Sequence, residues 1–566
     1  MARQYSQTFQ KYEEKGYIRK VPEAEAREGK KWYLPHFPVI REERSTTKVR
    51  VVFDAASRYH GKSLNDAIHP GPKLQGDIFK ILLRFRRYPV ALIGDISEMF
   101  LQVGLREEDR KFHRFLWRKM NQKRPPDVFE FQRLLFGNTS SPFLVHHVIR
   151  HHTEMNQQKF PKAAETVRQS TYVDDVIDSV KTTPECNELR QELSELLSTA
   201  GFQMQKWASN KLHALEGVAE KDLAPGFNLE EKSFPTMIKS LGVYWKPAED
   251  TLTFKVDSQN ATLSKREMLR QIAKIFDPLQ VLSPVTIRGK MMLQEAWKLK
   301  IGWDDPLPET IRKKFESWLE ELCMLDKVEI ARCLQPKDFT DRHLHVFVDA
   351  SSKAYGAVAY LRYEYEDTKP TIIFVAAKTR VAPLEPPAIP KLELMAARLG
   401  ARMTKTIAET LQISNKNLVF LSDSMDVLYW IKNDKKNHTQ FVTNRVSEIR
   451  ASTQGAQWRH IPGNLNPADK NSRGMKADEL LGSNWLSGPE FLSRRPEKWP
   501  VDNFEVSHSM NSQEPVRTFT VEENDGSGTI FKMKKVSEGD SVDVPFSPQY
   551  EELCAEKQMA RTTRRT

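Results

Sequence analysis

Apolar positions in the first 250 residues recur at two different spacings, and together they predict a mixed α/β region. Residues 48–54 (KVRVVFD) and 90–95 (VALIGD) are apolar runs that end in a carboxylate and predict strands. Two phenylalanines alternate with polar neighbours in a third predicted strand, Phe129 and Phe131. Four apolar residues recur at helical spacing between the first two runs and predict a helix with one apolar face: Ile78, Ile81, Leu82 and Phe85.

The second half of the chain is predicted to begin with helices and to continue as another α/β unit. Residues 255–335 have a mainly helical pattern that is broken by three prolines: Pro278, Pro284 and Pro306. Residues 343–352 (HLHVFVDASS) and 418–423 (LVFLSD) predict strands. Between these strands, five apolar residues predict an amphipathic helix over residues 391–411: Leu392, Ala396, Leu399, Met403 and Ile407. Beyond about residue 505 the chain is polar, so a largely disordered tail is expected.

Charge and cysteine usage narrow the possible partners and compartments. The 566 residues include 86 Lys and Arg against 75 Asp and Glu, a net charge of +11. This excess suits a nucleic-acid partner, although a membrane surface or simple solubility would also account for it. The four cysteines form no CxxC pair, which favours a reducing compartment over a zinc site or a disulfide framework. Because no apolar run reaches the roughly 18 residues of a membrane span and no signal-peptide core is present, an intracellular protein without a membrane partner is expected.

Two adjacent carboxylates in a β-like run provide the first candidate site. Asp174 and Asp175 follow Tyr172, and like charges this close raise each other's pKa unless a divalent cation neutralises them. Mg²⁺ suits such hard oxygen ligands. Asp95 ends another apolar run and could complete a site for two cations ~3.5–4 Å apart, which clamp the attacking and leaving oxygens of phosphoryl transfer. The alternatives are a solvent-exposed turn for the aspartate pair and a structural turn for Asp95.

A second set of carboxylates follows residue 340. Asp349 and Asp423 end predicted strands, Glu393 opens the predicted helix, and Asp469 lies in the run NPADKNSRG. Two strand-terminal aspartates and a glutamate on the intervening helix can converge at one edge of a sheet, where clustered carboxylates require cations. For each residue taken alone, an ordinary polar position in an α/β domain is the competing interpretation.

The ordered motifs within residues 30–250 resemble reverse transcriptases of the BEL/Pao group of long-terminal-repeat retrotransposons. LPHFPVIREERSTTKVRVVFDAAS resembles the fingers segment, which implies that Arg50 contacts the incoming triphosphate. GDISEMFLQV resembles the first catalytic motif, which implies that Asp95 is a metal ligand and that Phe100 is the steric gate against a ribose 2′-OH. The run YVDD supplies Asp174 and Asp175. A core position is the alternative for Phe100.

Three further motifs extend this resemblance. FGNTSSPFL resembles the motif that positions nucleotide and template, with Gly137 at the nucleotide and Ser141 and Pro142 at the primer–template. Phe136 stands where retroviral enzymes have glutamine, so a polar contact to the nucleotide sugar is expected to be absent. GFQMQKW implies that Lys206 protonates the leaving pyrophosphate, against the alternative of a solvated surface lysine. LGVYW resembles the primer grip, although its aromatic residues could equally be core. The remaining implied primer–template contacts are Tyr172, Gly242, Tyr244 and Trp245.

Residues 343–475 resemble ribonuclease H, because the second carboxylate set has that family's order Asp–Glu–Asp–Asp. The run HIPGNLNPAD resembles the family's mobile loop, which implies that His460 transfers a proton to the leaving group. A surface histidine is the alternative. The helical stretch 255–335, which includes Trp297 and Trp303, resembles the BEL/Pao connection and would carry the hybrid between the two sites.

The resemblance implies an RNA-directed DNA polymerase with ribonuclease H activity that uses two Mg²⁺ or Mn²⁺ ions in each active site. Its partners would be an RNA template, a DNA primer, an RNA–DNA hybrid and deoxynucleoside triphosphates; no sequence signal indicates an oligomeric state. It would act in the cytoplasm, in the element's virus-like particle, or in the nucleus. The alternative is a decayed or domesticated relative that binds nucleic acid without catalysis, but all seven carboxylates are present. Protease and integrase motifs are absent, so a processed piece, a truncated copy or a fragmentary gene model is expected.

The implied fold is an α/β and α+β multidomain chain: a right-hand polymerase of fingers, palm and thumb, a helical connection and an RNase H-like α/β domain. The predicted segments are a lead-in (1–30), fingers and palm (31–250), thumb and connection (251–335), an RNase H-like domain (340–480) and a C-terminal extension (481–566).

Overall fold

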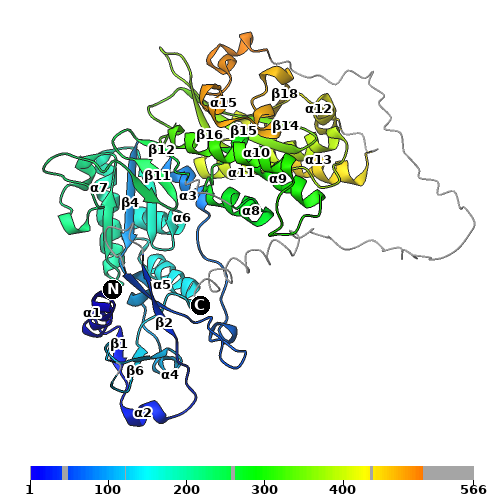
Figure 1. The fold of residues 1–566 in the computed structure, drawn as a ribbon. Coiled ribbons are helices and arrows are strands. Elements are labelled where there is room, and N and C mark those ends of the chain that lie inside the picture. Colours follow the sequence, from blue (N-terminus) through cyan, green and yellow to red (C-terminus); the bar gives the residue numbers. More distant parts are fainter. Residues whose placement is uncertain (1, 41–48, 122, 257–261, 434–437, 501–566) are drawn as a thin grey trace, which may run out of the picture. The chain divides into compact units, whose positions relative to one another are not determined.

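The computed structural model describes residues 2–40, 49–121, 123–256, 262–433 and 438–500, which all belong to one unit, Met1–Val506 (Figure 1). Two predicted features lie outside the described residues: part of the fingers motif, residues 41–48, and the disordered tail. Helices and strands are mixed along the chain, as predicted. None of the helices in the described part of the chain has the length and apolar character needed to cross a membrane.

The N-terminal region consists of two small antiparallel sheets around an aromatic core. One sheet has the order β1-β6-β5, and the other pairs β2 with β3. Helix α1 (Ala2–Glu14) adds Tyr5 and Phe9 to the core, where Phe53 and Phe131 pack edge to face. The strands predicted for residues 48–54 and around Phe129 are confirmed. The other elements are β1 (Ile18–Lys20), α2 (Glu23–Arg27), β2 (His36–Ile40), β3 (Val49–Phe53), α4 (Glu107–Arg110), β5 (Arg114–Trp117) and β6 (Asp127–Phe131).

A third sheet, of order β7-β8-β4-β9, carries the first candidate site. All of its pairings are antiparallel, and β4 is an inner strand whose apolar residues are buried. The predicted helix α3 (Ile78–Phe85) is confirmed, and the Asp77 side chain caps it by accepting hydrogen bonds from backbone N–H groups of its first turn. The remaining elements are β4 (Val90–Ile96), α5 (Ser141–Asn156), α6 (Pro161–Gln169), β7 (Thr171–Tyr172), β8 (Asp175–Val180), α7 (Thr183–Ser198) and β9 (Met204–Ala208).

A four-stranded sheet and three helices form the middle of the chain. The sheet order is β10-β11-β12-β13. Pro278 and Pro306 lie between helices, as predicted, but Pro284 does not break a helix. It lies in the first turn of α9, where proline is tolerated because the backbone N–H it lacks has no helical partner there. The elements are β10 (Ile238–Ser240), β11 (Val243–Lys246), β12 (Thr251–Thr253), α8 (Lys265–Lys274), α9 (Ser283–Lys298), α10 (Glu309–Glu321) and β13 (Glu329–Ala331).

The C-terminal region contains a five-stranded sheet of order β16-β15-β14-β17-β18. β14, β15 and β16 pair antiparallel, whereas β17 and β18 continue the sheet parallel to β14. The two strands and the helix predicted here are confirmed as β14, β17 and α11. The elements are β14 (Asp341–Ala350), β15 (Ala354–Glu364), β16 (Thr371–Val381), α11 (Ile389–Leu411), β17 (Leu418–Ser422), α12 (Met425–Lys432), α13 (Gln440–Ser452), β18 (Gln457–His460), α14 (Asp469–Arg473) and α15 (Ala477–Gly482).

Two fully buried arginines connect segments that are far apart in sequence. The Arg86 guanidinium follows α3 and donates to the carbonyls of Val375 (2.6 Å) and Phe374 (2.7 Å) on β16. Arg332 follows β13, donates to the carbonyl of Pro89 (2.7 Å) and pairs with Asp250 (2.8 Å). These hydrogen bonds compensate for the loss of water around the two buried guanidinium groups, which would otherwise make their burial unfavourable. They tie together α3, the paired strands β12 and β13, and strand β16 at the edge of the C-terminal sheet.

Candidate active sites

The first carboxylate group is assembled by the pairing of β4 with β8. Asp95 and Asp175 are register partners across this antiparallel pair, and Asp174 occupies the turn that leads into β8. The backbone N–H of Ile96 donates to the carbonyl of Asp174 (2.8 Å), which holds the turn against the end of β4. The structure therefore brings together the three aspartates that the sequence motifs predicted, from segments about 80 residues apart.

The turn itself has an unusual backbone conformation. Val173 has φ = 55°, in the left-handed region that a β-branched residue rarely adopts. Such strain persists only where the surrounding structure imposes it, and it is concentrated at functional sites. Here the β7–β8 hairpin imposes it, since Tyr172 and Asp175 on either side of the turn are register partners.

Lys206 and Gln205 both contact Asp95 from the neighbouring strand β9. Lys206 Nζ lies 3.1 Å from Asp95 Oδ2, and Gln205 Nε2 lies 2.9 Å from Oδ1. Burial raises the pKa of Asp174, and the charge of Asp95 raises it further. Burial also raises the pKa of Asp175 to about 7, with the charges of Asp174 and Asp95 adding to the effect. Three mutually repelling carboxylates that are partly buried form a donor set that fits a hard divalent cation.

Three other residues predicted to contact the nucleotide lie on β3, in the short helix after β4 and in the loop before α5. Arg50 on β3 lies over the ring of Phe136, with its guanidinium carbon 5.5 Å from the ring centre, and its charge lowers the pKa of Asp174. Phe100 is half-buried in the short helix Met99–Gln102. Gly137 is exposed at φ = 108°, a conformation that favours glycine.

Two predicted primer–template contacts are wrong because the residues are buried. Ser141 is inaccessible, and its hydroxyl donates to the carbonyl of Leu135, so it holds the loop before α5 in place. Trp245 is 1% exposed and its indole N–H donates to Asp250 Oδ1 (3.1 Å), which makes it a core residue. Pro142, in the first turn of α5, and Tyr172 remain half-buried.

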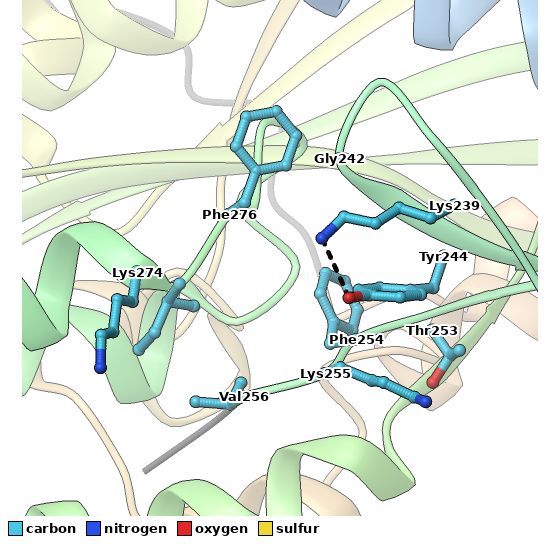
Figure 2. Close-up of a pocket in the computed structure, with 10 residues that line it drawn as sticks. Lys239, Gly242, Tyr244, Thr253, Phe254, Lys255, Val256, Lys274 and Phe276 are labelled. Atoms are coloured by element: carbon cyan, nitrogen blue, oxygen red, sulfur yellow. Dashed lines mark hydrogen bonds between the residues drawn. The ribbon is translucent and has the colours of Figure 1, made fainter. Parts of the chain in front are cut away.

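The other two residues of the LGVYW motif, Gly242 and Tyr244, line a pocket of about 350 Å³ (Figure 2). Gly242 has φ = 83°, and a Cβ there would lie 2.8 Å from the ring of Phe276, so glycine is required by both its conformation and this contact. The full lining is Lys239, Gly242, Tyr244, Thr253, Phe254, Lys255, Val256, Lys274, Ile275 and Phe276.

The pocket is basic and aromatic. Lys239 Nζ lies 3.0 Å from the Tyr244 hydroxyl and 4.8 Å from the centre of its ring, and Lys255 Nζ lies 5.7 Å from the same ring centre (Figure 2). Lys274 adds a third ammonium group to the lining. Among the described residues, no acidic side chain lines the pocket and none pairs with these three lysines. Lysines without an acidic partner, next to an aromatic ring, can bind the phosphates and stack on the bases of a nucleic-acid strand.

The second carboxylate group lies at one edge of the C-terminal sheet. Asp349 is at the end of β14 and Asp423 directly follows β17, and these parallel neighbours present their carboxyl ends at the same edge. Glu393 reaches them from the start of α11, which packs tightly on the sheet: a Cβ on Gly400 would lie 2.6 Å from Val348. One oxygen from each of the three carboxylates lies within 4.8 Å of the others. Among the described residues, this is the one group of three or more His, Cys, Asp or Glu side chains whose ligand atoms converge this closely, so the oxygens of Asp95, Asp174 and Asp175 lie farther apart.

The electrostatics of this trio favour a bound cation. Burial raises the pKa of Glu393 to about 9, and the charges of Asp349 and Asp423 raise it further. Burial likewise raises the pKa of Asp349 to about 6 and also raises that of Asp423. Glu393 Oε2 is buried and has no hydrogen-bond partner among the described residues. A buried carboxylate oxygen without a protein donor can bind a cation, and carboxylate oxygens fit Mg²⁺ or Mn²⁺.

The fourth predicted carboxylate and the predicted histidine lie close to the trio but outside it. Asp469 begins α14 and pairs with Arg473 one turn later on the same helix. Its charge nevertheless raises the pKa values of Asp349 and Asp423. His460 ends β18 as the register partner of Ser422, and its charge lowers the pKa of the adjacent Asp423.

Several residues at these sites could not be identified from sequence motifs. They are Gln205 beside Asp95, the pocket lysines Lys239, Lys255 and Lys274, and Asn466 and Ser472 beside the trio. The run NPADKNSRG contains the last two, but nothing in its spacing distinguishes them from surface polar residues.

Comparisons with known proteins agree with this order of sites. Residues 42–231 match the family model of reverse transcriptase (RNA-dependent DNA polymerase), and residues 264–424 match that of the Pao retrotransposon-like RNaseH-like domain. No curated protein matches the chain.

Three solved structures of the foamy viral protease–reverse transcriptase are similar at 14% identity. One, in complex with double-stranded DNA and designated dRH, has a TM-score of 0.48, with 79% of this chain and 67% of that chain covered. A complex with RNA/DNA hybrid has a TM-score of 0.44 (81% and 53%), and a second double-stranded DNA complex has 0.49 (81% and 82%). From the family matches, the chain carries a reverse transcriptase domain followed by a Pao retrotransposon-like RNase H-like domain, the arrangement of a BEL/Pao-type polyprotein.

Proposed function

We propose that the protein is an RNA-directed DNA polymerase that also cleaves the RNA strand of RNA–DNA hybrids. The observation that carries this proposal is the convergence of Asp349, Glu393 and Asp423, with a buried oxygen of Glu393 left without a partner. A purely structural cluster of this kind would be strongly destabilising. The register pairing of Asp95 with Asp175, with Asp174 in the adjoining turn, supports the polymerase reaction.

Mg²⁺ or Mn²⁺ held by each carboxylate group would supply the positive charge that activates an oxygen nucleophile and stabilises the leaving oxygen. In the polymerase reaction, the primer 3′-oxygen attacks the α-phosphorus of a deoxynucleoside triphosphate, and the bond to pyrophosphate breaks. Arg50 would bind the triphosphate through its guanidinium group, which also stacks on Phe136. Phe100 would close the sugar site against a 2′-OH, and Lys206 would donate a proton to the pyrophosphate oxygen.

In the nuclease reaction, a water oxygen attacks the phosphorus of the RNA strand and the bond to the 3′-oxygen breaks. His460, beside Asp423 at the end of β18, would deliver the proton that the departing oxygen takes up. Removal of the RNA template in this way would free the new DNA strand for second-strand synthesis.

The pocket at Gly242 and Tyr244 would hold the primer strand near its 3′ end. Its three lysines are free to neutralise backbone phosphates, and the Tyr244 ring offers a surface for stacking. Because Trp245 is buried, the primer would contact Gly242 and Tyr244 of the LGVYW motif but not Trp245.

Paired substitutions in the full chain test the proposal. Asp174→Asn should abolish primer extension on an RNA template while hybrid cleavage continues, and Asp423→Asn should have the opposite effect. Asp478→Asn, on the exposed face of α15, is a control that should retain both activities. Equal loss of both activities in each variant would argue against two independent sites. An unsubstituted protein that binds hybrid without either reaction would favour the decayed or domesticated alternative.

A further inference from the structure

The segment from Asn466 to Ser472 contacts both strand-terminal aspartates of the trio. The Ser472 hydroxyl donates to Asp349 Oδ2, and Ser472 is completely buried. Asn466 Nδ2 lies 3.4 Å from Asp423 Oδ1 and donates to the carbonyl of Val348 (3.0 Å), next to Asp349. One short segment thus supplies a hydrogen-bond donor to each of the two aspartates.

Helix α14, which carries Ser472, is itself held firmly on the sheet. The Ser472 carbonyl accepts a hydrogen bond from the Ser351 hydroxyl (2.9 Å), and Asn471 Nδ2 lies 3.2 Å from the carbonyl of Ala357 on β15. A Cβ on Gly356 would lie 2.6 Å from Asn471 Nδ2, so the helix and the strand are in direct contact. These contacts hold the backbone of Ser472 beside Asp349, where its hydroxyl can donate to the carboxylate.

We propose that Ser472, assisted by Asn466, is a positioning residue for cation binding at the nuclease site. By donating to Asp349 Oδ2, its hydroxyl would restrict the rotamer of this carboxylate and leave Oδ1 available to a cation. Asp469 begins the same helix. The hydrogen bond from Ser472 to Asp349 would therefore also hold the start of this helix, and with it the backbone of Asp469, in place relative to Asp349. Residues that orient metal ligands in this way commonly contribute roughly 10–100-fold to metal affinity. This inference rests on the proposed function, since it assigns a task within the same site.

Thr379 provides a matched comparison. Its hydroxyl is also buried and lies 3.0 Å from the carbonyl of Asn471 and 3.3 Å from that of Tyr355, so it too anchors α14. It has no recorded contact with a carboxylate of the trio. Loss of this hydroxyl should therefore weaken packing in the same region without changing the orientation of Asp349.

The test is calorimetric titration of the full chain with Mn²⁺ in the absence of nucleic acid. The component of the isotherm that Asp423→Asn removes is assigned to the nuclease site. Ser472→Ala should weaken this component about 10–100-fold, whereas Thr379→Val should leave it unchanged even if both variants lose thermal stability. Ser472→Cys, which keeps the side-chain size but has a weak donor, should give an intermediate affinity.

Unchanged Mn²⁺ affinity in Ser472→Ala, or equal weakening in Thr379→Val, would overturn the inference. If Ser472→Ala fails to fold, the comparison of Ser472→Cys with Thr379→Val decides in the same way. Failure of the proposed function would be seen separately, as an unsubstituted protein that binds Mn²⁺ at this site but does not cleave hybrid.

Discussion

The ammonium group of Lys206 lies 3.1 Å from Asp95 Oδ2, across the pairing of β9 with β4. Lys206 has φ = 55°, so its backbone leaves the regular strand geometry at the position where its side chain reaches the carboxylate. With 43% of its side chain exposed, it is accessible from solvent while it contacts a site residue. This placement favours a role in the reaction over that of a surface charge.

Lys206→Ala should reduce single-nucleotide incorporation by about 10²-fold or more, the usual contribution of a general acid. Lys211→Ala, a few residues later in an exposed loop, is the control and should extend primers normally. The measurement is a single-turnover rate of incorporation across a range of pH. Normal incorporation by Lys206→Ala at every pH would mean that the lysine only balances the charge of Asp95.

Glu393→Gln should stabilise the protein in the absence of divalent cations. The pKa of Glu393 is raised to about 9 in the folded protein, against an ordinary value of 4.5. The folded protein therefore holds the proton more tightly than the unfolded chain, and the stability that this group contributes below pH 4.5 is lost as the pH rises towards 9. At pH 8, with a chelator present, Glu393→Gln should raise Tm by at least roughly 2–4 °C. This is the change in Tm that about 1 kcal/mol of added stability produces in a domain of roughly 150–250 residues. The gain should disappear at pH 4.

Asp469→Asn is the control for this experiment, because Asp469 is paired with Arg473 and half exposed. It should not raise Tm in the chelator. Addition of Mn²⁺ should then make the unsubstituted protein more stable than Glu393→Gln, since that variant lacks one carboxylate of the trio. An unchanged or lower Tm for Glu393→Gln at pH 8 would contradict the electrostatic account of the trio.

Each lysine of the Tyr244 pocket should contribute to the salt dependence of primer–template binding. Replacing Lys239, Lys255 or Lys274 with Gln should reduce the slope of log affinity against log salt concentration by about 1 per lysine, as expected for the loss of one phosphate contact. Fluorescence anisotropy at several salt concentrations measures this slope. Lys221→Gln, outside the pocket, should leave it unchanged, and an unchanged slope in all three pocket variants would exclude a phosphate there.

Phe100→Ala should relax the choice between deoxy- and ribonucleotides. Its half-buried ring in the helix Met99–Gln102 is expected to fill the space of a 2′-OH, so truncation should raise ribonucleotide incorporation relative to deoxynucleotide by at least about tenfold. The ratio of kcat/KM values for the two substrates measures the effect. If incorporation of both substrates falls equally, Phe100 acts as a core residue.

Sequence patterns predicted the elements that carry most of the site residues. β4, β14, β17 and α11 each have a clear apolar run or helical periodicity, and each places an acidic residue at or near its end. β15 was not predicted, because it is buried on both faces and has no alternation of apolar and polar residues. Glu130 was taken for a polar neighbour in a strand but is buried, where Arg114 Nε lies 3.1 Å away.

Burial and long-range pairing account for the site residues that were misjudged. A motif identifies Ser141 and Trp245 by position but gives no information about the loop or core that covers them. Asp469 lies outside the trio, half exposed and paired with Arg473, and its action with the trio stays a prediction. The pocket lysines lie on β10, just after β12 and at the end of α8, so no single stretch of sequence contains the pocket.

The buried guanidinium groups of Arg86 and Arg332 have an evolutionary consequence. Arg86, in the reverse transcriptase part, donates to a main-chain carbonyl of the RNase H-like part, and Arg332, in the RNase H-like part, donates to a main-chain carbonyl of the reverse transcriptase part. Replacing one half with that of a distant element, in which these carbonyls lie elsewhere, would leave a charge in the interior without acceptors. A buried cation that loses its partners costs several kcal/mol, on the order of 3–5. Recombination between divergent elements should therefore exchange both catalytic halves together, and their lineages should share one phylogeny.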